Sequence, residues 1–375
     1  MAGIYIHFPF CMAKCAYCDF FSIPYRRDIA DQYSRALLSE ISLAAPWKET
    51  IDSIYFGGGT PSLAEPKQVE TGLKKIKGCF AVADDCETTL EANPGTVTFS
   101  KLKDFRDAGV NRLSLGVQSL SDEDLRFLGR IHDQKQVYQA VDWLHALDFN
   151  NFGLDLIYGI PGQSMHSWLD TLEQSVRMNP AHISCYLLQL DEETPLGRRV
   201  EEGTVQLLTE DEEADLYYRT IKELTNSGFE HYELSNFARP GYRSRHNMNY
   251  WMAGEYRGFG AGAVSFQKPT RYKNLPDVEQ YINDLLIGES HTIQLETMDA
   301  HESLADAMIL GLRLIEGVDT RSLFERFGID PLELYREVIF RSVGNGLLVA
   351  DLPNLRLTKR ALFLSNQVFR EFLNS

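Results

Sequence analysis

The feature that most constrains this chain is a group of three cysteines within its first twenty residues. Cys11, Cys15 and Cys18 form a CxxxCxxC pattern in the stretch YIHFPFCMAKCAYCDF at residues 5–20. Three thiolates are a soft ligand set, which selects zinc, copper(I) or an iron–sulfur cluster. With His7 as a fourth ligand they could form a zinc site. An iron–sulfur cluster held by three cysteines keeps one iron open for an outside ligand. Three separate core cysteines are the structural alternative.

Size, charge and the remaining cysteines narrow the class of protein. A chain of 375 residues predicts one large domain and a smaller one. Cys79, Cys86 and Cys185 are spread out, so this cysteine usage favours a reducing compartment, the cytoplasm, over a disulfide scaffold. The net charge of −16 argues against nucleic-acid binding and against adsorption on anionic lipid. No apolar run approaches the ~18 residues of a membrane span, and no signal-peptide pattern is present.

Strand-like and helix-like segments alternate through the first two-thirds of the chain. Six successive βα units predict a parallel sheet, and hence the α/β fold class. Their polar and glycine-rich turns follow the strands, where such folds carry their active sites. The expected strands are 4–7, 51–56, 88–92, 112–117, 152–158 and 182–190, and the expected helices are 28–43, 66–76, 100–108, 122–128, 134–147 and 164–178.

The last third of the chain has a different pattern. Residues 229–237 alternate like a strand, and residues 254–265 are glycine-rich and predict close turns. From about residue 276 the periodicity is helical. Two short strands are expected within 346–357, followed by a closing helix. Helices followed by a small hairpin resemble a winged-helix domain, whose packing against the first part is a better interpretation than DNA binding.

A glycine-rich turn follows the second expected strand. Gly58, Gly59 and Thr60 belong to the sequence GGGTP, which comes directly after the apolar run IYF. Glycines permit positive φ and close approach of the backbone to a ligand. A CxxxCxxC loop after the first strand and a GGGTP turn after the second resemble the radical S-adenosylmethionine (SAM) superfamily. Within it, most of the chain resembles the branch with the oxygen-independent coproporphyrinogen III dehydrogenase and the HemW-type heme chaperones.

This resemblance implies an architecture and a cofactor set. The fold would be a six-unit (β/α)6, three-quarter TIM-like barrel, open on one side, with a smaller, mainly helical, winged-helix-like C-terminal domain. The core barrel with the iron–sulfur and SAM sites would occupy residues 1–235, a linker segment with a heme motif 236–290, and the C-terminal domain 291–375. A [4Fe–4S] cluster would be bound by Cys11, Cys15 and Cys18. In that superfamily its open iron binds the amino-acid end of SAM, and one electron then cleaves SAM to a 5′-deoxyadenosyl radical.

The resemblance also assigns SAM contacts to residues at successive strand ends. Singly, each could instead be a solvated strand end, a core aromatic residue or a member of a surface ion pair. Together they match the spacing of the family. The implied contacts are Tyr5, Tyr17 beside the adenine, Gly58, Gly59 and Thr60 at the amino group, Glu91 at the ribose or amino group, Gln118, Arg130 at the carboxylate, and Asp155 at the ribose hydroxyls.

A second motif, HNMNYW at residues 246–251, fits the HNxxYW pattern of the HemW-type chaperones. Imidazole is a common axial ligand of heme iron, so the resemblance implies that His246 contacts heme. The nearby Arg239, Arg243 and Arg245 could pair with heme propionates. The structural alternative is a loop histidine that is hydrogen-bonded beside a core tryptophan.

Three hypotheses for function follow. The first is a heme chaperone that passes heme to apo heme proteins such as respiratory cytochromes, with an electron donor if SAM is cleaved. It would act in the cytoplasm, where partner proteins could hold it at the membrane, and no residue is assigned a catalytic role. The second is an oxygen-independent coproporphyrinogen III dehydrogenase, which Phe20 disfavours because that family has a further cysteine at this position. The third, a radical SAM enzyme that modifies RNA, is disfavoured by the charge and the motifs.

Overall fold

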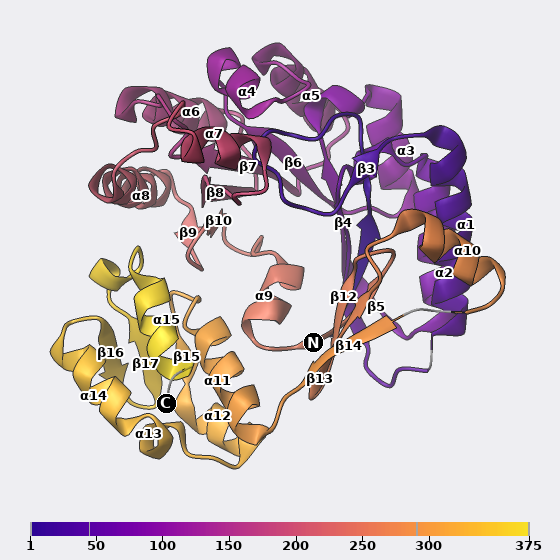
Figure 1. Cartoon of the computed structure of the whole chain (residues 1–375). Coiled ribbons are helices and arrows are strands. Elements are labelled where there is room, and N and C mark those ends of the chain that lie inside the picture. Colours follow the sequence, from indigo (N-terminus) through magenta and orange to yellow (C-terminus); the bar gives the residue numbers. More distant parts are fainter. Residues whose placement is uncertain (1, 45, 290–291, 374–375) are drawn as a thin grey trace.

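The structure is a computed structural model that describes residues 2–44, 46–289 and 292–373. Figure 1 shows a large sheet with helices along one side and a smaller, mainly helical part that contains the C-terminus. Helix α9 (Arg245–Trp251) lies between the two and packs against strands of the sheet and a helix of the smaller part. Within the described residues, no helix combines the length and apolar character that a membrane crossing requires.

The strands of the described chain form one large sheet, a small C-terminal sheet and a short pair near the cysteines. They are β1 (Ala2–Phe8), β2 (Phe10–Cys11), β3 (Ile23–Pro24), β4 (Ile51–Gly58), β5 (Val82–Ala92), β6 (Arg112–Gln118), β7 (Phe152–Tyr158), β8 (His182–Leu187), β9 (Glu230–His231), β10 (Asn236–Ala238), β11 (Glu255–Phe259), β12 (Val264–Gln267), β13 (Thr270–Asn274), β14 (Thr292–Thr297), β15 (Val318–Asp319), β16 (Leu348–Asp351) and β17 (Asn354–Leu357).

The helices follow the strands in the first two-thirds of the chain and dominate the last third. They are α1 (Arg27–Leu43), α2 (Pro66–Cys79), α3 (Phe99–Ala108), α4 (Asp122–Leu128), α5 (Gln134–Ala146), α6 (Met165–Arg177), α7 (Pro195–Glu201), α8 (Glu210–Asn226), α9, α10 (Val278–Leu286), α11 (Ala300–Gly311), α12 (Thr320–Phe327), α13 (Pro331–Leu334), α14 (Arg336–Gly344) and α15 (Ser365–Leu373), with short 3-10 turns η1 (Pro61–Leu63), η2 (Pro94–Thr96) and η3 (Lys359–Ala361).

The large sheet is open and has the strand order β14-β13-β12-β11-β1-β4-β5-β6-β7-β8-β10-β9. The six predicted strands are present, parallel and adjacent in chain order, which confirms the α/β class. The sheet is also larger than six units, because β11 pairs in parallel with the free edge of β1. The glycine-rich sequence of that segment predicts close turns, which is wrong for the strand residues 255–259. Beyond β11, the strands β12 to β14 continue the sheet in antiparallel fashion.

The strands have one apolar and one polar face, because successive side chains point to opposite sides of a sheet. Ile6 and Phe56 face α1 and α2, where they meet Ile41 and Val69. The opposite surface, which we call the polar face, is lined by Tyr5, Tyr55, Glu91, Ser114 and Asp155. Apolar packing therefore attaches the helices, and the polar face is left for a site.

A buried carboxylate joins the extra strands to the first helix. Glu40 of α1 accepts hydrogen bonds from the Gly260 amide at 2.8 Å, from Asn274 Nδ2 at 2.6 Å and from the Tyr281 hydroxyl at 2.6 Å. Burial raises the pKa of Glu40. One side chain thus connects α1 with the end of β11, with β13 and with α10.

The C-terminal part contains helices around a small antiparallel sheet of order β15-β17-β16. The expected hairpin within 346–357 is present as β16 and β17, and the winged-helix comparison stays a prediction. Strand β14 belongs to the large sheet, to which β13 joins it. The predicted boundary between residues 290 and 291 lies outside the described residues.

We expect Tyr281→Phe to lower the free energy of unfolding by about 1–3 kcal/mol, because it removes a donor to a buried carboxylate. Urea unfolding followed by circular dichroism measures the effect. Tyr242→Phe is the control, since its side chain is on the surface and such changes usually stay within about 0.5 kcal/mol. Equal stability of the two variants would show that the Glu40 cluster does not hold the sheet extension.

Candidate functional site

The cysteine loop leads from β1 toward α1 and is fixed by the glycine-rich turn. The amides of Gly59 and Thr60 donate to the carbonyls of Phe8 and Phe10 at 2.9 and 2.8 Å. A Cβ added at Gly59 would lie 2.7 Å from the Phe10 carbonyl oxygen, so a larger residue cannot occupy this position without moving the loop. The GGGTP turn therefore packs directly against the backbone that carries the first cysteine.

The three cysteines are free and half-exposed at this end of the sheet. Arg130 donates from Nη1 to Cys15 Sγ at 3.2 Å, and the Thr60 hydroxyl lies 3.6 Å from Cys11 Sγ. Burial raises the pKa of the Cys18 thiol, and the neighbouring Cys15 and Cys11 raise it further. A buried guanidinium beside thiols stabilises their thiolate form, which is the form that binds metal.

A zinc site of three cysteines and a histidine finds no support in the arrangement of His7. Its Nδ1 lies 3.1 Å from the Tyr5 hydroxyl and its Nε2 lies 3.0 Å from the Phe21 carbonyl oxygen. Among the residues described, no three His, Cys, Asp or Glu side chains are grouped to hold a single metal ion. Soft thiols without an available fourth protein ligand suit an iron–sulfur cluster with one open iron.

Two half-buried carboxylates, Glu91 and Asp155, lie on the polar face. Glu91 accepts from the Tyr55 hydroxyl at 2.8 Å and from the Gly58 amide at 3.3 Å. Burial raises the pKa of Glu91 to about 7, and the nearby Asp155 adds to the shift. Asp155 accepts from Ser114 at 2.8 Å, and burial raises its pKa as well. Both carboxylates would gain from a cationic ligand, which favours their ionised form.

The end of β6 brings three further residues together. Gln118 adopts a left-handed backbone conformation with φ of 67°. A Cβ added at Gly116 would lie 3.2 Å from Gln118 Nε2 and 3.4 Å from Arg130 Nη2. Arg130 also donates to the Gly116 carbonyl at 2.8 Å. This corner offers a guanidinium and an amide, which are suitable partners for a carboxylate.

The two predicted aromatic contacts occupy different surroundings. Tyr5 is on the polar face and lies against Tyr55, with ring centroids 6.2 Å apart. Tyr17 is half-buried between the cysteines and packs against the apolar residues Leu128 and Ile157. Burial raises the pKa of both hydroxyls, so both stay protonated.

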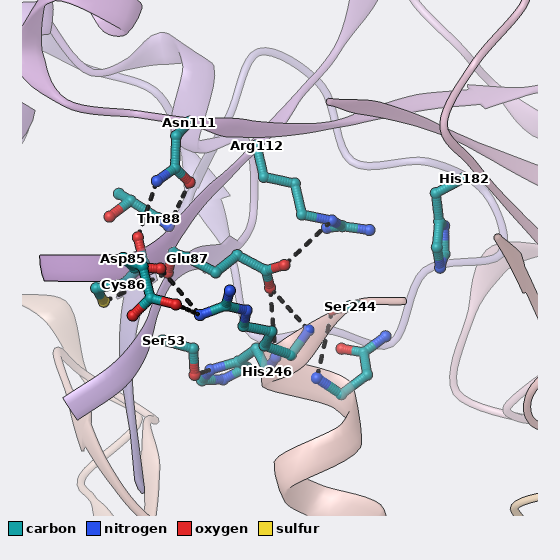
Figure 2. A network of polar contacts seen from close by, with 12 residues as sticks. Ser53, Asp85, Cys86, Glu87, Thr88, Asn111, Arg112, His182, Ser244 and His246 are labelled. Carbon is teal, nitrogen blue, oxygen red and sulfur yellow. Dashed lines mark hydrogen bonds and ion pairs between the residues drawn. The ribbon is translucent and has the colours of Figure 1, made fainter. Parts of the chain in front are cut away.

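The structure does not bring His246 to the cysteines. His246 lies in the first turn of α9, at the other end of β1, and its side chain is 1% exposed. Its Nδ1 lies 2.8 Å from Ser53 Oγ and its Nε2 lies 2.9 Å from the Tyr250 hydroxyl. Burial lowers the pKa of His246 to about 3, and Arg112 contributes. Figure 2 shows this histidine in a polar network with Ser53, Glu87 and Arg112.

The three arginines that precede His246 in the sequence also have interaction partners within the protein. Arg245 pairs with Asp85 at 2.9 Å, and Arg243 pairs with Glu230 at 3.3 Å. Arg239 donates to the Ser227 carbonyl at 2.6 Å and stacks on Phe229. The structure therefore gives each of these arginines a partner within the protein.

Charged residues that no sequence motif indicates line the polar face beside His246. Arg112 is 2% exposed, and its Nε lies 4.0 Å from Glu87. Glu87 accepts from the His246 amide at 3.3 Å. The available signal was the period of two, which puts Glu87, Thr89 and Glu91 on one face of the same strand.

Comparisons with known proteins show the family and the fold of the chain. Residues 5–174 match the family model described as the radical SAM superfamily, and residues 298–364 match the HemN C-terminal domain. The fold resembles that of coproporphyrinogen III oxidase (HemN) from Escherichia coli, with a TM-score of 0.86 and 23% identity over 99% of this chain and 89% of that one. Fold and site thus define a radical SAM protein, and that superfamily implies a [4Fe–4S] cluster and SAM.

Named relatives of this chain identify its family within the radical SAM superfamily. The "heme chaperone HemW" of Lactococcus lactis is 35% identical over 98% of this chain and 96% of that protein. The HemW of Bacillus subtilis is 33% identical over 100% and 99% of the two chains, and that of Escherichia coli is 39% identical over 70% and 69%. The chain therefore belongs to the HemW family of radical SAM proteins.

We expect Cys15→Ala to lose the cluster while the protein keeps its fold, because the residue is on a half-exposed loop. Iron and sulfide content and visible absorption after anaerobic reconstitution measure the loss. Cys79→Ser is the matched control, since Cys79 is an exposed cysteine at the end of α2. Stoichiometric zinc without iron or sulfide in the unaltered protein would contradict the assignment.

Proposed function

We propose that this protein is a heme chaperone, which binds heme and delivers it to apo heme proteins such as respiratory cytochromes. The observation that carries the proposal is the similarity to HemW proteins over the full length of the chain. The proposed location is the cytoplasm, with partner proteins holding it at a membrane. We also propose residues 1–235 as the radical SAM core, built on six βα units, 236–290 as the linker with the heme motif, and 291–375 as a winged-helix-like domain. The linker also contributes β11, β12 and β13 to the large sheet, and the last part contributes β14.

The proposed cofactor site uses the residues at the cysteine end of the polar face. Cys11, Cys15 and Cys18 would hold a [4Fe–4S] cluster; together with SAM, this cluster would supply one-electron chemistry when an electron donor is present. Two features of the chain support SAM binding. The half-buried carboxylates of Glu91 and Asp155 suit the positive sulfonium group of SAM, and the guanidinium of Arg130 suits its carboxylate. The proposed SAM contacts are Tyr5, Tyr17, Gly58, Gly59, Thr60, Glu91, Gln118, Arg130 and Asp155.

Heme binding through His246 would require a rearrangement around α9. Both ring nitrogens already have a hydroxyl neighbour within hydrogen-bond distance. Ligation of heme iron would therefore require Nε2 to leave Tyr250, or Nδ1 to leave Ser53, and the helix α9 to move. A neutral imidazole, which burial favours, is the form that binds iron.

The alternative function is that of an oxygen-independent coproporphyrinogen III dehydrogenase. The similarity of the fold to HemN favours this alternative. Phe20 argues against it, because this side chain replaces a family cysteine and is 64% exposed at the cysteine loop.

We expect Asp155→Asn to weaken SAM binding by about tenfold, because the substitution removes a negative charge from a buried site. Calorimetry on the cluster-loaded protein measures the affinity. Asp142→Asn on the exposed side of α5 is the control for a charge change far from the site. Unchanged affinity in the Asp155 variant would remove this residue from the proposed contacts.

The function itself is tested by offering heme and coproporphyrinogen III separately to anaerobically purified protein. We expect heme to be retained and to pass to an apocytochrome, whereas His246→Ala retains less heme or shows an altered absorption spectrum. A porphyrin with new vinyl groups would instead identify a dehydrogenase. A His246 variant with unchanged spectrum, stoichiometry and transfer rate would exclude His246 as a ligand.

A further inference from the structure

We infer that His246 is a positioning residue of the SAM site, which holds Tyr55 in place so that the Tyr55 hydroxyl fixes the carboxylate of Glu91. The inference rests on the proposed SAM site and is independent of heme binding. It gives the HNxxYW motif a role at the cofactor end of the sheet, although the motif itself lies at the opposite end of β1.

Aromatic contacts hold the His246 ring firmly against Tyr55. The two ring centroids are 5.0 Å apart with an angle of 24° between the planes, and Tyr5 stacks on the same histidine at 6.4 Å. Tyr250 meets the histidine edge-on at 4.8 Å. On the remaining side, a Cβ added at Gly3 would lie 3.0 Å from His246 Cε1. The imidazole thus fills a space that leaves it little freedom to move.

Hydrogen bonds fix the same ring in its plane. A neutral imidazole donates from one nitrogen and accepts at the other, and a hydroxyl can take either role. Ser53 and Tyr250 can therefore satisfy both nitrogens, whichever tautomer is present. The His246 amide also donates to Glu87, so the backbone of α9 is tied to β5. The ring is consequently a rigid support beneath Tyr55.

Tyr55 transmits this support to the SAM site. Its hydroxyl donates to Glu91 Oε1, while the Gly58 amide donates to Oε2 of the same carboxylate. These two donors orient both oxygens of Glu91 next to the glycine-rich turn. Without the histidine, Tyr55 would lose a stacked neighbour and could tilt into the space left behind, so its bond to Glu91 would weaken.

The consequence is a shift in the pH dependence of SAM binding. The titratable and charged groups that face Glu91 are Tyr5, Tyr55, Tyr250, Asp155 and Arg112. Burial raises the pKa of Glu91 to about 7, and the hydrogen bond from Tyr55 lowers it. Cationic SAM prefers ionised Glu91, so affinity should rise with pH through this pKa. Weakening the Tyr55 bond raises the pKa, which moves that rise to higher pH.

The test measures SAM affinity by calorimetry from about pH 6 to about pH 9 on cluster-loaded, heme-free protein, a range that spans the Glu91 titration. Tyr55→Phe, which removes the hydroxyl, should weaken SAM at neutral pH by about 5- to 10-fold and move the midpoint upward. His246→Ala should also weaken SAM binding at neutral pH and move the midpoint upward. The double variant His246→Ala/Tyr55→Phe should bind SAM no more weakly than Tyr55→Phe alone, because both residues act on Glu91 through the same contacts. His246→Phe, which keeps the stacking, should retain more affinity than His246→Ala.

His231→Ala is the matched control, since it also removes a histidine stacked on an aromatic ring, here Phe237 at 4.5 Å. We expect it to leave SAM affinity and the midpoint unchanged. If His246→Ala does not fold, Ser53→Ala and Tyr250→Phe each remove one hydrogen-bond partner of the imidazole and should show smaller shifts in the same direction. A folded His246→Ala protein with unaltered affinity and midpoint would overturn the inference. Heme retention, measured separately, tests the proposed function and not this inference.

Discussion

The burial of charge on the polar face is the constraint on which the site depends. Glu87, Glu91, Arg112 and Asp155 all lie on this face, where Glu87 and Arg112 are buried and Glu91 and Asp155 are half-buried. A charge removed from water must find a partner or change its ionisation state. Arg112 has its nearest carboxylate oxygen at 4.0 Å, and the carboxyl groups of Glu91 and Asp155 have raised pKa values. The polar face therefore suits charged ligands. The opposite face of the sheet, which the helices cover, supplies the apolar packing that holds the strands.

The sequence predicts this fold well where the signals are local. The six parallel strands follow from apolar runs that alternate with helical periods, and the cysteine spacing with the GGGTP turn marks one end of the site. Strand β11 could not be predicted in this way, because a parallel partner far along the chain leaves no local signature. Its glycines instead suggested turns. One reason for those glycines is visible at Gly258, where an added Cβ would lie 2.2 Å from the Val264 carbonyl oxygen.

Sequence motifs predict residue types for the site, but they do not predict how those residues are arranged in space. Thr60 and Arg130 contact the cysteines, and Glu91 accepts from the Gly58 amide of the glycine-rich turn, whereas Asp155 lies in the middle of β7 and accepts from Ser114. For His246, the motif predicts a chemical role but does not predict where the residue lies in the fold. The structure puts it against Gly3, whereas the cysteine loop begins after Phe8. With a rise of about 3.3 Å per residue, these two ends of β1 are separated by about 16 Å. His246 therefore does not touch the cysteine loop, and any influence of one on the other passes through the tyrosines that lie between the two ends of β1.

The position of β11 has a consequence for how the chain acquires its structure. Strand β1 is synthesised long before β11, which is one of its two neighbours in the sheet, so Ala2 and Glu255 must find each other across most of the chain. Pairing over such a separation gives a high contact order, which slows folding. Until β11 emerges from the ribosome, the N-terminal strand presents an unpaired edge, and such edges recruit other chains. A shortened chain of residues 1–235 would keep this edge permanently, so the strands of the cofactor site depend for their solubility on a segment that follows them.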